Sequence, residues 1–254
     1  MGRRSVRPAE QDRWVFNRLA ADYRERPGYP AALADRLLEL AGGVGSRVAD
    51  LGAGTGHLAI PLARLGACVL AVEPALAMLE ALEAQASRGQ VVPVHAPAEQ
   101  TGLPDGSCEM VLIADALQWM DAERTGLEVR RILGRGGVLA VVEGRFAATP
   151  FLSALSALVA EANPKAQPSR PGPRAQLFAC AGLRPPAGER FRQQERLGPR
   201  RLDSVLRSLS YVGPALSPAA LASLLERARA MAEDHGGAVW DRELTLWWAR
   251  SRPA

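Results

Sequence analysis

The fold is decided by one short stretch, VADLGAGTG at residues 48–56. Its first half is an apolar run bounded by turn residues, which is typical of a buried strand over residues 47–51. The three glycines that follow allow sharp turns and let the backbone approach a ligand closely. A helix is expected at residues 57–65, and its first N–H groups would face the loop. The stretch therefore predicts a polar ligand bound where a strand ends.

The sequence around this loop alternates between strand and helix patterns. Further buried strands are predicted at residues 68–72, 91–94, 110–114 and 138–142, with helices at 75–86 and 121–133. Strands that alternate with helices form a mostly parallel sheet covered by helices on both faces. We therefore expect a single α/β domain over residues 1–254.

Helices are also expected before and after this core. Helical spacing occurs at residues 9–22 and 31–41, and again near 150–162, 202–209 and 218–233. A strand-like segment at residues 244–248 could pair at the end of the sheet. Residues 163–173 contain four prolines and a glycine, which prevent regular structure. That segment is either a passive connection or a lid over a pocket.

The composition argues against several classes of function. The 31 basic residues are scattered and include a single lysine, Lys165, so no basic face for nucleic acid is predicted. Three cysteines and three histidines lie far apart in the sequence, so no disulfide framework or metal site is expected. No apolar run reaches the ~18 residues of a membrane span, and the N-terminus lacks an apolar leader. We expect a cytoplasmic protein without nucleic-acid or membrane partners.

Two carboxylates near the glycine loop indicate its ligand. The loop has the spacing Gly-x-Gly-x-Gly, whereas dinucleotide sites have Gly-x-Gly-x-x-Gly to seat a pyrophosphate. Asp50, just before the loop, would repel a pyrophosphate but could accept hydrogen bonds from a cationic amine. Glu73 ends the second strand and could accept both hydroxyls of an adenosine ribose. The pair favours S-adenosylmethionine (SAM) over NAD, which leaves a nicotinamide-dependent oxidoreductase as the weaker alternative.

With these motifs, the sequence resembles the class I SAM-dependent methyltransferases, in particular the type 11 small-molecule group. The resemblance covers most of the chain and includes residues 48–56, 72–74, 96–99 and 103–107. It implies a Rossmann-like fold with a mostly parallel seven-stranded sheet, N-terminal helices and a helical insertion after the fifth strand. It also implies SAM as cofactor and S-adenosylhomocysteine (SAH) as product. The family usually has Asp where this chain has Pro97, so the adenine amine loses a side-chain acceptor there.

The resemblance assigns roles to segments and to individual residues. It implies an N-terminal helical cover at 1–41, a cofactor-binding core at 42–146, and substrate-side helices with the final strands at 147–254. The expected substrate-binding residues are Tyr29, Arg145 and Tyr211. The expected cofactor-binding residues are Tyr23, Arg26, Asp50, Gly52, Ala53, Gly54, Gly56, Glu73, Pro74, Met78, Ala98, Glu99, Asp115 and Ala116.

Gln118 and Trp119 are the catalytic candidates. They follow the fourth predicted strand, where the ligand crevice of such a sheet opens. The Gln-Trp pair is similar to that of trans-aconitate methyltransferase and of the malonyl carrier-protein methyltransferase, and both esterify a carboxylate. A structural alternative remains, in which Trp119 packs on a helix and Gln118 caps it.

The settings of the three histidines indicate which type of acceptor the protein methylates. None of His57, His95 and His235 has the setting of a general base, which a neutral hydroxyl acceptor would need. A carboxylate or an acidic enol is already ionised near neutral pH. We therefore expect O-methylation of an acidic small molecule, with natural-product biosynthesis as the expected setting. Methylation of carbon or nitrogen and SAM binding without methyl transfer remain as alternatives, and the oligomeric state is left open.

Overall fold

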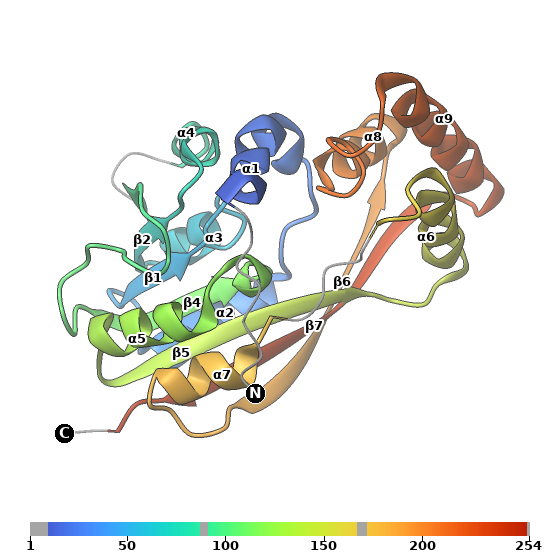
Figure 1. The fold of residues 1–254 in the computed structure, drawn as a ribbon. Coiled ribbons are helices and arrows are strands. Elements are labelled where there is room, and N and C mark those ends of the chain that lie inside the picture. Colours follow the sequence, from blue (N-terminus) through green and yellow to red (C-terminus); the bar gives the residue numbers. More distant parts are fainter. Residues whose placement is uncertain (1–9, 87–90, 167–171, 253–254) are drawn as a thin grey trace, which may run out of the picture.

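The computed structural model describes residues 10–86, 91–166 and 172–252, and its centre is a seven-stranded sheet. The strands follow the order β3-β2-β1-β4-β5-β7-β6 across the sheet (Figure 1). They are β1 (Arg47–Leu51), β2 (Cys68–Val72), β3 (Val91–Val94), β4 (Cys108–Ala114), β5 (Leu133–Phe146), β6 (Ala187–Leu197) and β7 (Ala238–Arg250). The helices are α1 (Glu10–Tyr23), α2 (Ala31–Ala41), α3 (Ala59–Arg64), α4 (Leu76–Glu83), η1 (Leu117–Trp119), α5 (Ala122–Ile132), α6 (Pro150–Ala162), α7 (Arg174–Cys180), α8 (Pro199–Ser208) and α9 (Pro218–Asp234).

The sheet is mixed, with parallel strands first and an antiparallel hairpin last. β1 pairs in parallel with β2 and β4, β2 pairs with β3, and β4 pairs with β5. β7 runs antiparallel between β5 and β6. The expected Rossmann-like, mostly parallel seven-stranded sheet is confirmed.

The last two strands differ from the sequence prediction. Residues 244–248 were expected at the end of the sheet, whereas β7 is longer and lies between two neighbours. The edge strand is β6, which the sequence pattern missed together with α7. β6 is mostly polar because it pairs with one neighbour only, and charged side chains protect an edge strand from unwanted pairing.

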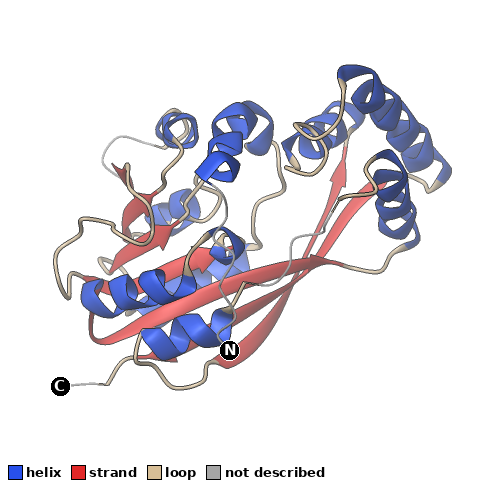
Figure 2. Ribbon diagram, in the orientation of Figure 1, coloured by secondary structure: helices blue, strands red, loops and turns tan. Residues whose placement is uncertain are grey.

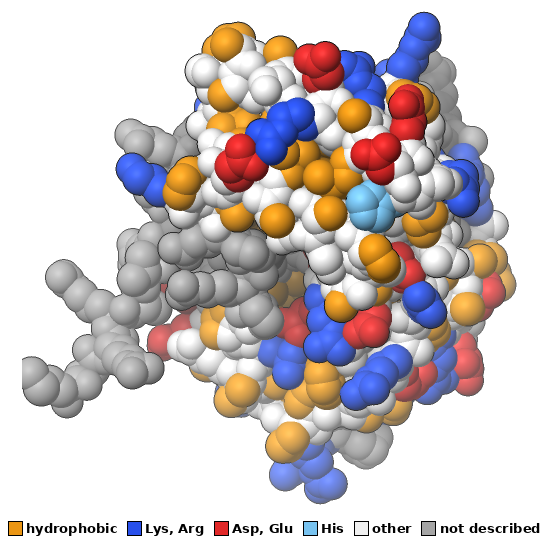
Figure 3. All heavy atoms as spheres, turned by 90° about the vertical axis from the view of Figure 1, so that its right-hand side faces the viewer, with side chains coloured by type: hydrophobic (Ala, Val, Ile, Leu, Met, Phe, Trp, Pro, Cys, Tyr) orange, Lys and Arg blue, Asp and Glu red, His pale blue; other side chains and the backbone are white. Residues whose placement is uncertain are grey.

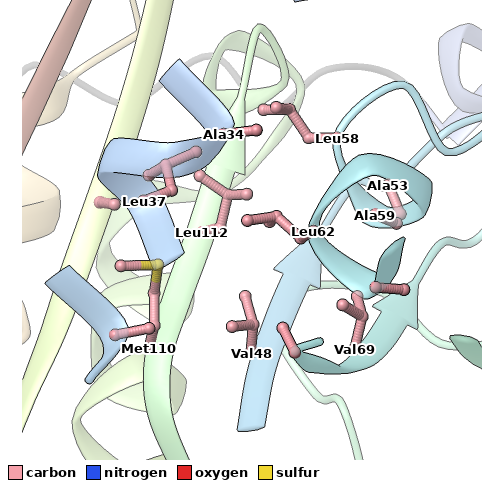
Figure 4. Packing of buried hydrophobic residues seen from close by; sticks show 14 of the residues in the cluster. Ala34, Leu37, Val48, Ala53, Leu58, Ala59, Leu62, Val69, Met110 and Leu112 are labelled. Carbon is pink, nitrogen blue, oxygen red and sulfur yellow. The ribbon is translucent and has the colours of Figure 1, made fainter. Parts of the chain in front are cut away.

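Helices cover both faces of the sheet, as predicted (Figure 2). On one face, Leu37 of α2 and Leu62 of α3 are fully buried in a cluster with Met110 and Leu112 of β4 (Figure 4). On the opposite face, α5 and α7 pack in a second cluster with alternate residues of the same strands. The two clusters hold the parallel strands rigid, and the loops at their carboxyl ends are fixed with them.

A third apolar cluster lies beyond the parallel strands. β6 and β7 extend past them, and α6, α8 and α9 gather around the far end of this hairpin (Figure 1). Trp240 of β7 is buried in the same cluster as residues of all three helices. We call α6, α8 and α9 the cap. Helix α1 contacts both α8 and α4, so it connects the cap with the parallel part of the sheet.

The surface shows no large area of one charge on the face seen in Figure 3, where acidic, basic and hydrophobic side chains are interspersed. Several of the described arginines are paired with carboxylates, as Arg227 of α9 is with Glu161 of α6 at 2.7 Å. Among the described residues, no helix has the length and apolar character needed to cross a membrane. The same residues contain no group of His, Cys, Asp and Glu side chains arranged to hold a metal ion.

Candidate cofactor and acceptor site

One pocket gathers almost all of the predicted site residues. It lies at the carboxyl ends of β1, β2 and β4, where ligands of such sheets bind, and its cavity measures about 240 Å³. Residues of α1, of the link between α1 and α2, of the loop after α8 and of β7 form its other walls. Of the residues predicted for the site, Gly56 and Arg145 fall outside the lining.

Glu73 is held in place by the loops on either side of it. The N–H of Gly54 donates to Oε2 of Glu73 at 3.0 Å, and the N–H of Ala75 donates to Oε1 at 2.9 Å. Both oxygens keep a further lone pair, because a carboxylate oxygen can accept two hydrogen bonds. The carboxylate is therefore fixed in the pocket and able to accept from ligand hydroxyls.

The glycines determine the shape of the loop. A Cβ on Gly52 would lie 2.7 Å from Cβ of Ala116, so the loop packs tightly against the loop after β4. Gly56 has φ +89° and packs against Leu82, which explains its place outside the pocket. Helix α3 begins at Ala59 rather than directly after the glycines. The helix thus starts two residues later than predicted, and its N-cap residue Leu58 lines the pocket.

Asp50 is buried at the end of β1 and lines the pocket beside Glu73. Burial, followed by the negative charge of Glu73, raises the pKa of Asp50 to about 7. Burial also raises the pKa of Glu73, against the opposing effect of its two N–H donors. A cationic group between the two carboxylates would relieve their repulsion. The pair thus fits the amine and the ribose hydroxyls of SAM.

Arg26 ties the N-terminal segment to the cap. Its Nε donates to Oγ of Ser208 and its Nη2 donates to the carbonyl oxygen of Ser208, both at 2.7 Å. The guanidinium carbon also lies 4.0 Å from the centre of the Tyr23 ring, a cation–π contact. These partners are neutral, so they leave the positive charge of Arg26 available to an anionic group in the pocket.

His57 lines the pocket as a neutral side chain. Its Nε2 lies 3.1 Å from the carbonyl oxygen of Arg26, and its Nδ1 lies 3.3 Å from Oγ1 of Thr55. Burial, followed by the charge of Arg26, lowers the pKa of His57 to about 4. Because both ring nitrogens are engaged, His57 is poorly placed to take a proton from an acceptor. The other two histidines lie outside the pocket lining.

Asp115 is the centre of a second polar cluster. Its Oδ1 accepts from the N–H of Gly144 at 2.9 Å, and its Oδ2 accepts from the Tyr29 hydroxyl at 2.8 Å and from Nη2 of Arg242 at 2.5 Å. Its φ is +49°, a conformation that Asp tolerates better than most residues. Burial pushes the pKa of Asp115 upward, but Arg242, Tyr29 and Gly144 together bring it below its ordinary value. The Asp115–Arg242 pair is therefore ionised.

Gln118 and Trp119 both line the pocket, and each has a structural contact. Nε2 of Gln118 donates to the carbonyl oxygen of Asp115 at 2.8 Å. The ring of Trp119 meets that of Phe16 edge-on, with 5.2 Å between ring centres. These contacts agree with the structural alternative for the pair. Their catalytic role stays a prediction.

The two remaining substrate-binding candidates differ in position. Tyr211 lines the pocket. Burial raises the pKa of its phenol, and the positive charges of Arg26 and Arg242 oppose that rise. The phenol therefore lies close enough to both guanidinium groups to interact with their charges. Arg145 is exposed and pairs with Glu243 at 2.7 Å. Its neighbours along β5 line the pocket, and adjacent residues of a strand point to opposite faces, so Arg145 points away from the pocket.

Arg242 is central to the pocket but was not predicted from the sequence. The alternation of β7 places Arg242 on the same face as Trp240 and Leu244, which are buried. An arginine among buried positions of one face is a signal for a site. The strand prediction began at residue 244, so position 242 fell outside the pattern.

Comparisons with known proteins point to a methyltransferase. A family model described as "Methyltransferase domain" matches residues 49–141. An uncharacterized methyltransferase of Mycobacterium tuberculosis is 43% identical over 119 residues, which is 47% of each chain. The malonyl-[acyl-carrier protein] O-methyltransferase of Geobacter sulfurreducens is 33% identical over 147 residues, 54% of this chain and 52% of that protein. The chain spans about half the length of the curated relatives it matches.

Solved structures extend the likeness over the whole fold. A candidate type II methyltransferase from Anaeromyxobacter dehalogenans has a TM-score of 0.64 and 25% identity, covering 90% of this chain and 99% of that chain. The [4+2]-cyclase SpnF has a TM-score of 0.57 at 19% identity, covering 98% and 100%, a likeness of fold alone. The matched residues 49–141 contain the glycine loop and the Asp50–Glu73 pair, so this part of the chain is a methyltransferase domain of the SAM-dependent kind, with SAM as cofactor.

Proposed function

We propose that the protein transfers a methyl group from SAM to an anionic oxygen of a small molecule, namely a carboxylate or an acidic enol of natural-product metabolism. The observation that carries this proposal is the joint lining of one cavity by Glu73, by Arg26 and Arg242, and by Tyr29 and Tyr211. Guanidinium and phenol groups suit an acidic acceptor, since both donate hydrogen bonds to anionic oxygen.

Three charged side chains match the polar groups of the cofactor. Glu73 suits the ribose hydroxyls, Asp50 the ammonium group, and Arg26 the carboxylate. Pro74 and Ala98 line the same pocket and are the proposed neighbours of the adenine. When bound, SAM supplies a methyl carbon that forms a C–O bond with the acceptor while the S–C electron pair returns to sulfur, giving SAH.

The residues of the chain position the acceptor and exclude water. Phe146 and Trp240 form an apolar wall, with 4.7 Å between their ring centres, and Leu209, directly after α8, lines the same cavity. Alignment and desolvation account for much of the rate of such displacements. An acceptor that is already ionised needs no general base, which agrees with the neutral, hydrogen-bonded state of His57.

The proposal is tested by transfer from methyl-labelled SAM into a pool of small acids and enols, followed by mild alkali. Label released as methanol would support an ester product. Alkali-stable label in a phenol, amine or carbon position would contradict the acidic acceptor and favour N- or C-methylation. The Glu73→Ala variant is the control, because it should lose transfer together with SAH binding. Tight SAH binding without transfer to any acceptor would favour a SAM-binding protein that transfers no methyl group.

A further inference from the structure

Arg242 lies on the acceptor side of the pocket. Glu73 follows β2, whereas Arg242 belongs to β7, and β1, β4 and β5 separate these two strands in the sheet. The Arg242 guanidinium reaches back to Asp115 after β4 and over Gly144 of β5, two to three strands from β2, which is about 10–14 Å at ~4.8 Å between neighbouring strands. A ribose held at Glu73 is therefore at the other end of the site from the Arg242 guanidinium.

The guanidinium of Arg242 is fixed in orientation and keeps hydrogen-bonding capacity. Its Nη2 donates to Oδ2 of Asp115, which also accepts from Tyr29. A guanidinium carries five N–H groups, and this bond uses one of them. The Arg242 side chain is 16% exposed, and it lines the cavity. A charged donor that is anchored on one side and lines a cavity suits a second anionic partner.

The side chains around Arg242 indicate what the ligand carries besides its anionic group. The rings of Phe146 and Trp240 pack edge to face beside it in the same cavity, and Leu209 adds an aliphatic contact. These side chains offer apolar surface and no charge. A ligand that fills this end therefore combines an anionic group at Arg242 with an apolar body beside Phe146 and Trp240.

We propose that Arg242 binds the carboxylate of the acceptor, and that the protein thereby selects small carboxylic acids with an apolar body. One carboxylate oxygen accepts from Arg242, and the other faces the methyl group. The second oxygen forms the C–O bond as the S–C bond breaks, and no proton is released. The inference rests on the proposed function, to which it adds the recognising residue and the class of acid.

The test measures binding without turnover. Protein saturated with SAH is titrated with benzoate, phenylacetate and cinnamate, and with the corresponding neutral amides, by isothermal titration calorimetry. Wild-type protein should bind at least one acid at least about tenfold more tightly than its amide. Arg242→Gln should weaken the binding of that acid about tenfold or more and leave SAH affinity within about threefold. The acid affinity of Arg242→Lys should lie between those of wild type and Arg242→Gln, because lysine keeps the charge without the planar fork. Arg227→Gln, on the surface of α9, is the matched control.

A double variant separates recognition from structure. Arg242→Gln alone leaves the half-buried Asp115 carboxylate without its cation, which can unfold the protein. Asp115→Asn with Arg242→Gln restores a neutral, hydrogen-bonding pair, and this double variant should fold and still bind the acid weakly. Acid binding equal to wild type in the double variant would overturn the proposal. Equal affinity for acids and amides, or no acid binding by the wild type, would overturn it as well. Since no methyl transfer is needed, Arg242-dependent acid binding without labelled product would contradict the proposed function alone.

Discussion

The guanidinium of Arg242 lies directly over Gly144, and a Cβ on Gly144 would come within 2.6 Å of its Cζ. The absence of a side chain at this position of β5 makes room for an arginine that reaches across from β7. The N–H of Gly144 also donates to Asp115, the partner of Arg242. One glycine thus supports both members of the ion pair.

Gly144→Ala should therefore displace Arg242 and weaken acceptor use. We expect kcat/KM for the acceptor to fall about tenfold or more, which corresponds to about 1.4 kcal/mol of transition-state stabilisation. SAH affinity, measured by calorimetry, should stay within about threefold. Gly198→Ala is the control, because a Cβ there meets nothing within 4 Å and its φ of −73° suits alanine. Unchanged kinetics in Gly144→Ala would contradict the packing argument.

Glu73→Gln should weaken cofactor binding. The amide replaces one acceptor oxygen with an NH₂ group, which faces the N–H of Gly54 or of Ala75 and can no longer accept from it. We expect the Kd for SAH to rise about tenfold, or about 1.4 kcal/mol, by calorimetry. Glu83→Gln, on the exposed side of α4, should leave it unchanged. A Kd for Glu73→Gln within twofold of wild type would show that Glu73 does not hold the ribose.

SAH binding should depend on pH through Asp50. With a pKa of about 7, Asp50 is largely protonated at pH 6 and ionised at pH 8 in the free protein. The ammonium group of SAH favours the ionised form, so affinity should rise about tenfold between pH 6 and 8. Asp50→Asn should remove this dependence, whereas Asp35→Asn, exposed on α2, should retain it. A pH dependence that survives in Asp50→Asn would assign it to another group.

The stability of the ligand-free protein should fall as the pH rises, whereas SAH affinity should increase. The Asp50 carboxyl titrates near pH 3.9 in the unfolded chain and at about 7 in the folded one, so the folded state binds the proton more tightly. Its contribution to the free energy of unfolding is complete below about pH 4 and is lost as the pH rises to 7. Thermal melting without ligand should show a smaller loss between pH 5 and 7 for Asp50→Asn than for wild type. Parallel curves would contradict the raised pKa.

The rate of transfer should not follow the protonation of His57. Because its pKa is about 4, His57 stays neutral from pH 6 to 9. His57→Gln keeps an N–H donor for the carbonyl oxygen of Arg26, and its kcat at saturating SAM should have the same pH profile over that range. A limb near pH 6.5 that disappears in His57→Gln would identify His57 as a general base.

The parallel part of the fold could be predicted from local patterns alone. The predicted limits of β1, β2 and β3 agree with the structure. β1 and β2 are buried over most of their length, and such strands appear as apolar runs between turn residues. The positions of Asp50 and Glu73 follow from these strands, since each lies at a carboxyl end. The cofactor half of the site was therefore accessible from sequence.

The acceptor half of the site could not be predicted from the sequence, because it depends on pairing between distant segments. Whether Arg145 or its neighbour Gly144 faces the pocket is set by the register of β5 against β7, and a shift by one residue would exchange them. Arg242 enters the site through the same register. β6 lacked an apolar pattern, so the hairpin that carries Arg242 was only partly predicted.

The antiparallel direction of β7 brings residues near the end of the chain to the same edge as the glycine loop. Asp50, Glu73 and Asp115 fall within the part matched by the methyltransferase family model, which ends at residue 141, whereas Trp240 and Arg242 lie about a hundred residues further on. The two functions of the pocket are thus encoded in separate stretches of sequence. Under the proposed assignment, substitutions on β7 would redirect the protein to another acceptor while its methyl donor is retained, and relatives alike only in the matched part would share the donor without sharing the acceptor.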